Sequence, residues 1–193
     1  LMLVLGLGLV VSPTMSSTAI NGDRNAGTLA ILQVTMLGPA EIAVGKLLAG
    51  WAAALAFLAV SLPFLIWGAV ISRVDPLGWL LSMVVLALLL GVVCAIGLGF
   101  SSLTTRPAGS SVLTYVAVVS LTVLSLIVFL VSIPAVTTRD EVQTLVVPAD
   151  ANATCEWITQ SQDVLHTERT WWLLAINPFV VLADASPGSA STD

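Results

Sequence analysis

The sequence predicts an all-helical protein that crosses a lipid membrane several times, because of its composition and its four long apolar stretches. Of its 193 residues, 58% are hydrophobic and only 9% are charged, and the mean hydropathy is +1.05. Soluble domains carry about 25% charged residues, so a chain this poor in charge needs lipid around it. Its net charge of −5 also disfavours nucleic-acid binding, which requires clustered Lys and Arg.

Four apolar stretches are long enough to span a bilayer. A hydrocarbon core of about 30 Å needs about 20 helical residues. The predicted spans cover residues 1–20, 42–71, 77–100 and 112–136. Pro63 lies inside the second of them, where we expect a kink because proline removes a backbone hydrogen bond.

Two predicted spans carry small residues at four-residue spacing, a pattern that lets helix backbones approach closely in lipid. The two sets are Gly45, Ala49 and Ala53, and Gly91, Ala95 and Gly99. They predict tight helix packing, either within this chain or against a partner.

Two further segments follow the fourth predicted span. Residues 137–170 are polar and acidic, so we expect a long loop there. Residues 171–183 are apolar but too short to cross the membrane, which predicts a short interfacial or re-entrant helix. Trp171 and Trp172 suit the headgroup region, where tryptophan is enriched. Because the sequence begins within an apolar run and ends in a polar tail, we expect further spans on both sides.

Charge does not decide which side of the membrane each loop faces. Each side of the predicted bundle receives three Lys or Arg residues: Arg24, Lys46 and Arg106 on one, and Arg73, Arg139 and Arg169 on the other. The rule that Lys and Arg favour the cytoplasm therefore gives a tie.

The segment between the first two spans predicts a short helix. Charge and glycine at residues 21–24 suit an exit from lipid and a turn. Thr28 can cap the helix that follows, and Gly38 and Pro39 would end it. Three apolar side chains would share one face of this helix: Leu29, Leu32 and Met36. Such a helix either lies in the membrane interface or docks into a groove on a partner. Residues 30–39 carry no Lys or Arg, which favours docking.

This segment resembles the one that defines the membrane subunits of type-2 ABC transporters, a family of drug, lipid and polysaccharide exporters. The family pattern is an acidic and a basic residue, a Gly-Thr-Leu triplet, a short apolar helix, and an acidic residue before Gly-Lys. The matching residues are Asp23, Arg24, Gly27, Thr28, Leu29, Glu41, Ile42, Gly45 and Lys46. The sequence departs from the pattern at three points: Asp23 replaces Glu, Met36 replaces Pro, and Pro39 comes later than the usual proline.

Two later motifs extend the resemblance. Ser101 and Ser102 precede a short basic connection that is similar to the family's next cytoplasmic loop. Asn177, Pro178 and Phe179 resemble an Asn-Pro motif that follows the family's fifth span. The resemblance implies a six-span fold, in which the four predicted spans would be the second to the fifth.

The resemblance also implies which segments face the cytoplasm. Residues 23–46 and 101–111 would be cytoplasmic, and residues 137–170 would be external. Residues 171–183 would form the short external helical region before the sixth span. Residues 27–36 would be a coupling helix, which sits in a cleft of a separate ATPase subunit and moves the spans when ATP is used.

The resemblance assigns the ATPase-coupling role to nine residues: Asp23, Arg24, Gly27, Thr28, Leu29, Leu32, Met36, Glu41 and Lys46. Asp23 and Arg24 would anchor the ends of the coupling helix by charge-assisted hydrogen bonds, unless they simply form a solvated turn. Lys46 lies near the end of its span, where its amine can also reach the headgroups. Glu41 lies five residues before Lys46, which is too far round an ideal helix for an ion pair.

The predicted spans favour an apolar cargo. None of the four carries an ionisable side chain in its middle, which disfavours a proton-coupled antiporter or an ion channel. Phe57, Phe64 and Trp67 would suit a path for a hydrophobic or amphipathic molecule, although each could instead face lipid or a neighbouring helix.

The sequence predicts no cofactor, metal or catalytic site in this chain. It has no phosphate-binding Gly-Lys loop and no nucleophile with a base, and His166 and Cys155 do not show metal-ligand spacing. ATP and magnesium would therefore be bound by the partner ATPase.

We therefore predict the permease subunit of an ABC exporter in a bacterial plasma membrane, paired with a like or related permease and with two ATPase subunits. One rival hypothesis is a structural or assembly subunit of another membrane complex, in which residues 27–36 merely lie in the interface. Another is a membrane-embedded enzyme, which would need polar catalytic groups that these four spans lack.

Overall fold

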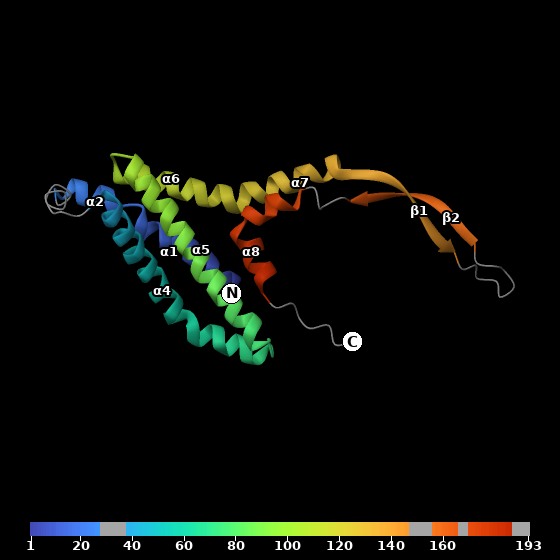
Figure 1. The fold of residues 1–193 in the computed structure, drawn as a ribbon, viewed down its shortest axis with the longest axis horizontal. Helices are drawn as coiled ribbons and strands as arrows, with labels where there is room; N and C mark the ends of the chain where they lie inside the picture. The colour runs from blue at the N-terminus through green and yellow to red at the C-terminus, as the bar shows by residue number, and fades with distance from the viewer. Residues whose placement is uncertain (28–37, 147–155, 166–169, 187–193) are drawn as a thin grey trace.

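The computed structural model describes residues 1–27, 38–146, 156–165 and 170–186. Its helices form a bundle from which a two-stranded hairpin projects (Figure 1). Four helical segments are long and apolar enough to cross a membrane, and the described part of the chain has no sheet besides the hairpin. The predicted fold class, an all-helical bundle with several membrane spans, is confirmed.

The first span consists of two consecutive helices, α1 (Met2–Ser16) and α2 (Ala19–Asn25). The sequence predicted a span that ends near residue 20, followed by a turn at residues 21–24. The structure differs, because the chain bends slightly earlier and α2 then continues through this stretch. Asp23 therefore lies on a helix rather than in a turn.

The start of α2 is capped by a residue far away in the sequence. The side chain of Thr18, which precedes α2, makes no capping hydrogen bond. Instead, Ser101 near the end of α5 (Pro76–Leu103) accepts hydrogen bonds from the backbone N–H groups of Ile20 and Asn21, at 3.1 and 3.2 Å. N–H groups in the first turn of a helix lack partners within the helix, so this contact explains why α2 forms where a turn was expected.

Four of the described helices begin with proline at their first position, which suits proline because no N–H is needed there. They are α4 (Pro39–Ile71), α5, α6 (Pro107–Val119) and α8 (Pro178–Ala185). The second span thus begins a few residues before residue 42, the predicted start. The Glu41 carboxylate supports this start by accepting a hydrogen bond from the Gly38 N–H at 2.7 Å.

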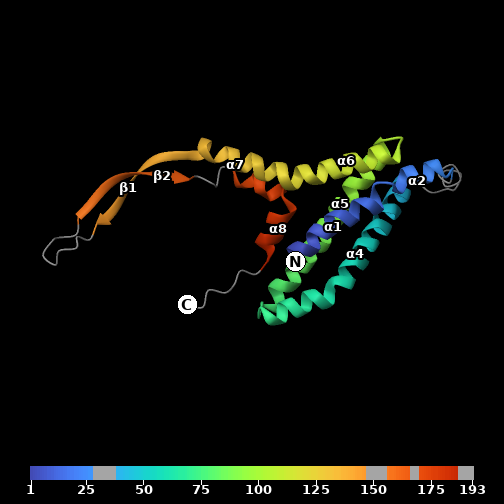
Figure 2. The same ribbon diagram turned by 180° about the vertical axis from the view of Figure 1, so that it is seen from behind.

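Helix α4 bends in its second half (Figure 2). Pro63 lies inside the helix in this half. Because proline lacks the N–H that would bond to the preceding turn, it accounts for a bend of this kind, as the sequence predicted.

The fourth span is made of three consecutive segments. It starts with α6 and ends with α7 (Ser125–Val136), and a π-helical segment, η1 (Ser120–Leu124), joins the two. The sequence predicted one regular helix over residues 112–136. The span starts earlier, at Pro107, and its π-helical turn was not predicted.

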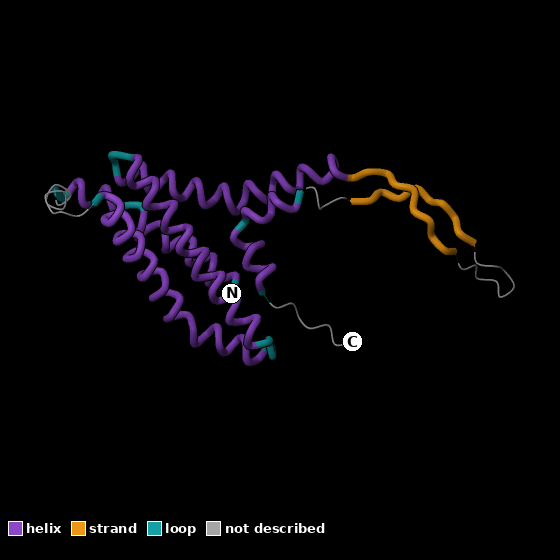
Figure 3. The backbone as a smooth tube through the Cα atoms, in the orientation of Figure 1, coloured by secondary structure: helices purple, strands orange, loops and turns teal. Residues whose placement is uncertain are grey.

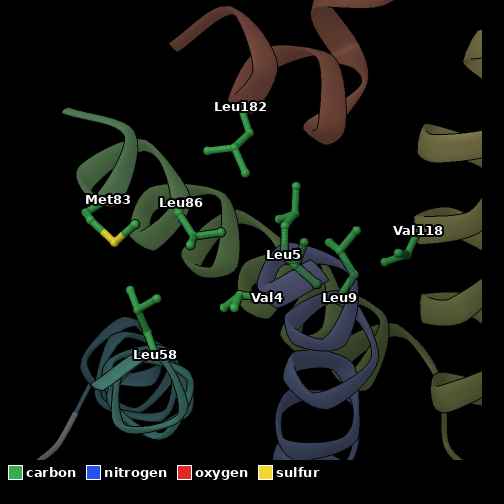
Figure 4. Packing of buried hydrophobic residues seen from close by; sticks show 9 residues of the cluster. Val4, Leu5, Leu9, Leu58, Met83, Leu86, Val118 and Leu182 are labelled. Carbon is green, nitrogen blue, oxygen red and sulfur yellow. The ribbon is translucent and has the colours of Figure 1, made fainter. Parts of the chain in front are cut away.

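The core of the bundle lies around α1. Figure 4 shows leucines and valines of α1, α4, α5, α6 and α8 pointing toward one another. Leu5, Leu86 and Leu182 are completely buried there. Because α8 contributes Leu182 to this core, the last described helix packs within the bundle.

Two glycines allow α1 and α5 to approach each other closely. A Cβ atom added at Gly8 would collide with the Leu90 side chain, and one at Gly97 would collide with Ser16. Close backbone contact of this kind is typical of helices that pack in lipid. Neither glycine belongs to the small-residue sets that the sequence predicted.

The predicted small-residue sets are used unevenly. Gly91 leaves room for the Trp51 indole, whose Nε1 donates a hydrogen bond to the Ala87 carbonyl at 2.8 Å. A Cβ atom added at Gly45 or Gly99, in contrast, would have no atom of another element within 4 Å. Of these three glycines, only Gly91 therefore serves close packing inside the described bundle.

The acidic segment after the fourth span contains a β-hairpin where we expected a loop. Strand β1 (Thr137–Val146) pairs antiparallel with β2 (Glu156–Leu165), with Thr137 opposite Leu165 and Val146 opposite Glu156. Both strands contain several Thr, Val and Ile residues, which favour extended structure. These residues, rather than the acidic ones between them, decide the local conformation.

The segment predicted as one short helix at residues 171–183 forms two. A 3-10 helix, η3 (Trp171–Ile176), is followed by α8, with Asn177 between them. Trp171 and Trp172 are largely exposed, at 60% and 57%. Helix α8 instead turns back into the bundle.

Candidate functional site

Four helix ends meet at one end of the bundle: the end of α2, the start of α4, the end of α5 and the start of α6 (Figure 3). We call this region the polar end. Its polar side chains that bond to another helix or helix end are Ser17, Asn21, Asp23, Lys46, Ser101, Thr104, Ser110 and Ser111. Residues 28–37, which connect α2 to α4 here, lie outside the described residues.

An ion pair joins the two helices that flank residues 28–37. The Lys46 amine on α4 pairs with the Asp23 carboxylate on α2 and also donates a hydrogen bond to the Ala19 carbonyl at 2.7 Å. The Lys46 and Asp23 side chains are only 20% and 30% exposed, so water and salt screen their attraction less than at an open surface. Lys46 therefore holds α2 against α4.

A second set of hydrogen bonds fixes α2 on the end of α5. Asn21 is completely buried, and its Nδ2 donates to the Thr104 hydroxyl at 3.1 Å. The cap from Ser101 acts on the same turn of α2. Because buried polar groups are costly unless they are paired, these contacts define one position for α2.

Serines link the junction of α1 and α2 to the start of α6. The Ser110 hydroxyl donates to the Ser17 carbonyl at 2.6 Å, and the hydroxyls of Ser17 and Ser111 lie within hydrogen-bond distance at 3.0 Å. The Ser17 carbonyl is available because α1 has already ended there. The polar end thus ties together four of the bundle's helices.

The other residues predicted for the coupling role are placed as follows. Arg24 is exposed on α2. Gly27 follows α2 with φ of +71°, a left-handed conformation that favours glycine after a helix. Glu41 caps α4. The remaining predicted residues lie outside the described part of the chain: Thr28, Leu29, Leu32 and Met36.

The three aromatic residues predicted for a cargo path do not share one surface. Phe57 is partly buried and packs against the core. Phe64 and Trp67 face outward from α4 and are 81% and 72% exposed. Only Phe64 and Trp67 are therefore brought together, on the outside of the bundle.

A further buried polar contact lies where α8 meets the fourth span. Asn177 is completely buried, and its Nδ2 donates to the Thr122 carbonyl at 2.8 Å and to the Ser125 hydroxyl at 2.9 Å. Its Oδ1 accepts a hydrogen bond from the Phe179 N–H at 2.9 Å, which caps α8. Thr122 lies in the π-helical segment, where the helix is locally widened, so its carbonyl is accessible to Asn177.

Several of these contacts were not predicted from the sequence. The sequence placed Asn21 only in an exit from the membrane, and it did not indicate the pairing of Asp23 with Lys46. One signal was available: the sequence places Ser, Thr or Asn at the end of the first span and at both ends of the connection between the third and fourth. Polar residues repeated at the same level of several spans indicate contact between them.

No group of three or more His, Cys, Asp or Glu side chains among the described residues could hold a metal ion. Cys94 is a buried free thiol. Cys155 and His166, which did not show metal-ligand spacing, lie outside the described residues.

Four apolar spans, joined at one end by buried polar contacts, define an integral membrane protein with several spans. The sequence model of the ABC-2 family of transporter proteins matches residues 3–193, and the chain belongs to this family. It is thus a type-2 ABC permease, a membrane transport component of the kind that works with an ABC ATPase and is not itself a catalytic enzyme. Comparisons with curated proteins and with solved structures gave no match.

Proposed function

We propose that this chain is the permease subunit of an ATP-driven exporter in a bacterial plasma membrane. Residues 27–36 form its coupling helix, which docks into a cleft of a separate ATPase subunit on the cytoplasmic side. Two permeases, identical or related, work with two ATPase subunits, which bind ATP and magnesium.

The observation that carries this proposal is the bracing of both ends of residues 28–37. Lys46 ties the start of α4 to α2, while Ser101 and Asn21 tie α2 to α5. A push on the intervening segment would therefore move three spans together, because none of these helix ends can shift without breaking a partly or fully buried polar contact. A segment that merely rested in the interface would not require such bracing.

The cargo is hydrophobic or amphipathic. Ionisable residues of the described spans lie near the span ends: Asp23, Arg24, Glu41 and Lys46. Moving an ion or proton across the bilayer generally requires ionisable groups at its centre. The exposed Phe64 and Trp67 on α4 add an apolar surface along which a lipid-like or drug-like molecule could bind.

Co-purification with the ATPase tests the coupling helix. A tagged permease should bring down an ABC ATPase from solubilised membranes, and Leu29→Asp or Leu32→Asp should abolish this without preventing membrane insertion. Val34→Asp is the matched control, since it introduces the same charge on the opposite face of the predicted helix.

Each outcome decides between the hypotheses. Loss of the ATPase with Leu29→Asp and Leu32→Asp, but not with Val34→Asp, supports an apolar docking face. Equal binding by all three variants contradicts it. A wild-type chain that brings down other membrane subunits but no ATPase favours the assembly-subunit hypothesis.

A further inference from the structure

The turn between α4 and α5 forms one side of an apolar groove. The groove has a volume of about 250 Å³ and is open to the surroundings. Its lining residues are Ile66, Ala69, Val70, Arg73, Val74, Pro76 and Trp79. Arg73 is the only charged residue among them, and it stands at the turn itself.

Two further hollows follow the groove along α4, and we call the three together the furrow. Val70 and Trp67 line a neighbouring hollow, and Trp67 lines a third together with Pro63 and Phe64. From residue 63 to residue 73 the helix rises roughly 15 Å, which is about half the thickness of the hydrocarbon core. The apolar furrow therefore has the length of a lipid chain within one leaflet.

Arg73 is not neutralised by any residue that the structure describes. Its side chain is exposed, and no ion pair among the described residues involves it. The nearby Asp75 carboxylate is used to cap α5, because it accepts a hydrogen bond from the Gly78 N–H at 2.9 Å. An exposed guanidinium that makes no ion pair with the described residues can bind two oxygens of an anion. Its planar set of N–H donors fits phosphate.

The position of Arg73 matches the headgroup region of a membrane. The turn lies at the end of the bundle away from the polar end (Figure 1). Helix α4 has 33 residues, which gives it a length of roughly 50 Å, more than the hydrocarbon core of about 30 Å. The helix is therefore longer than the hydrocarbon core is thick, and the half-buried Trp79 beside Arg73 is a residue type enriched at the headgroup level.

We propose that this groove binds a glycerophospholipid, with one acyl chain in the furrow along α4 and its phosphate on the Arg73 guanidinium. The apolar lining selects for the chain, and the unneutralised cation at its end selects for the phosphate. The furrow includes Phe64 and Trp67 of the surface proposed for cargo, but lipid binding there does not rest on the ATPase-coupling role, because the site lies away from residues 27–36.

The backbone conformation of Arg73 allows its cation to be removed by substitution without disturbing the turn. Arg73 has φ of +49° and is the only described non-glycine residue with positive φ. It follows closely after the end of α4, a position where glycine is favoured. Arg73→Gly should therefore remove the guanidinium while the turn keeps or gains stability.

Binding to the full-length chain in detergent, measured by native mass spectrometry, separates the two parts of the site. The three probes are a phosphatidylglycerol, the diacylglycerol with the same chains, and glycerophosphoglycerol without chains. We expect the phosphatidylglycerol to bind at least about tenfold tighter than either partial probe, because the diacylglycerol lacks the charge-assisted contact and glycerophosphoglycerol lacks the apolar chains.

Two variants with matched controls test the residues. Arg73→Gly should weaken phosphatidylglycerol binding by about tenfold and leave diacylglycerol binding unchanged, whereas Arg106→Gly at the polar end should change neither. Ala69→Phe, which fills the groove, should weaken both lipids. Ala43→Phe, in a separate groove on the same helix lined by Ile20 and Leu98, should not.

The proposal is overturned if phosphatidylglycerol and diacylglycerol bind equally, if Arg73→Gly and Arg106→Gly act alike, or if Ala69→Phe has no effect. Tight binding of glycerophosphoglycerol alone would also contradict it, because it would show a site for a soluble phosphate rather than for a lipid. Thermal unfolding of Arg73→Gly, expected at or above the wild-type temperature, excludes a folding defect.

Discussion

Among single residues, Lys46 makes the contacts on which the polar end depends most. Its amine holds both the Asp23 carboxylate and the Ala19 carbonyl, so one side chain fixes two points of α2. Asp23 is partly buried, and it would be left without this cation if Lys46 were replaced. A carboxylate in this position is costly when it loses its cation.

We predict that Lys46→Met destabilises the protein by about 1.5–3 kcal/mol, the range for hydrogen bonds to charged groups. Unfolding by a denaturing detergent would measure the loss. Asp23→Asn should cost less, because the amide oxygen can still accept from Lys46. The double variant should be less destabilised than the sum of the two, and strict additivity would show that Lys46 and Asp23 do not interact in the membrane.

Among the elements, helix α8 is held in place by Asn177, the residue that precedes it in the sequence. Asn177 bonds to the π-helical segment of the fourth span and at the same time caps α8. Leu182 then lies in the core with Leu5 and Leu86. The π-helical turn and the docking of α8 are therefore parts of the same contact.

We predict that Asn177→Ala releases α8 and destabilises the protein by about 1–3 kcal/mol, since its partners lose their hydrogen bonds. Hydrogen exchange should increase at η1 and at α8 together. Asn25→Ala, at an exposed position on α2, is the control and should change neither. An increase confined to α8 would show that η1 forms without Asn177.

The close packing of α1 against α5 depends on Gly97. Gly97→Ala should destabilise the bundle by about 1–3 kcal/mol, because its Cβ would collide with Ser16. Gly99→Ala has open space around it, so it should be neutral or stabilise the helix by up to about 1 kcal/mol. Thermal unfolding of the two variants side by side measures the difference, and equal effects would contradict the close approach of α1 and α5.

For the whole molecule, the sequence predicted those features that depend on the pattern of neighbouring residues along the chain. Apolar runs revealed the four spans, Pro63 marked the helix that bends, and the motif around Asp23 and Lys46 led to the correct family. These features could be predicted because a membrane span must be continuous and apolar along the chain.

The features that were not predicted depend on residues far apart in the sequence. Ser101 caps α2 across 80 residues and Asn177 reaches Thr122 across 55. The sequence offers Lys46 no acidic partner on its own helix, since Glu41 is too far round it, whereas its partner Asp23 lies on another helix. Only the folded arrangement brings such pairs together, so neither the helix at residues 19–25 nor the π-helical turn could be predicted from local pattern.

The proposed coupling role requires that residues 27–36 lie in the cytoplasm and dock on an ABC ATPase. A single cysteine at position 32, in a chain with Cys94 and Cys155 replaced by alanine, tests it with a thiol reagent that cannot cross membranes. We predict labelling in inside-out vesicles but not in intact cells, and protection of the cysteine when the ATPase is bound. Labelling from outside intact cells would contradict the claim.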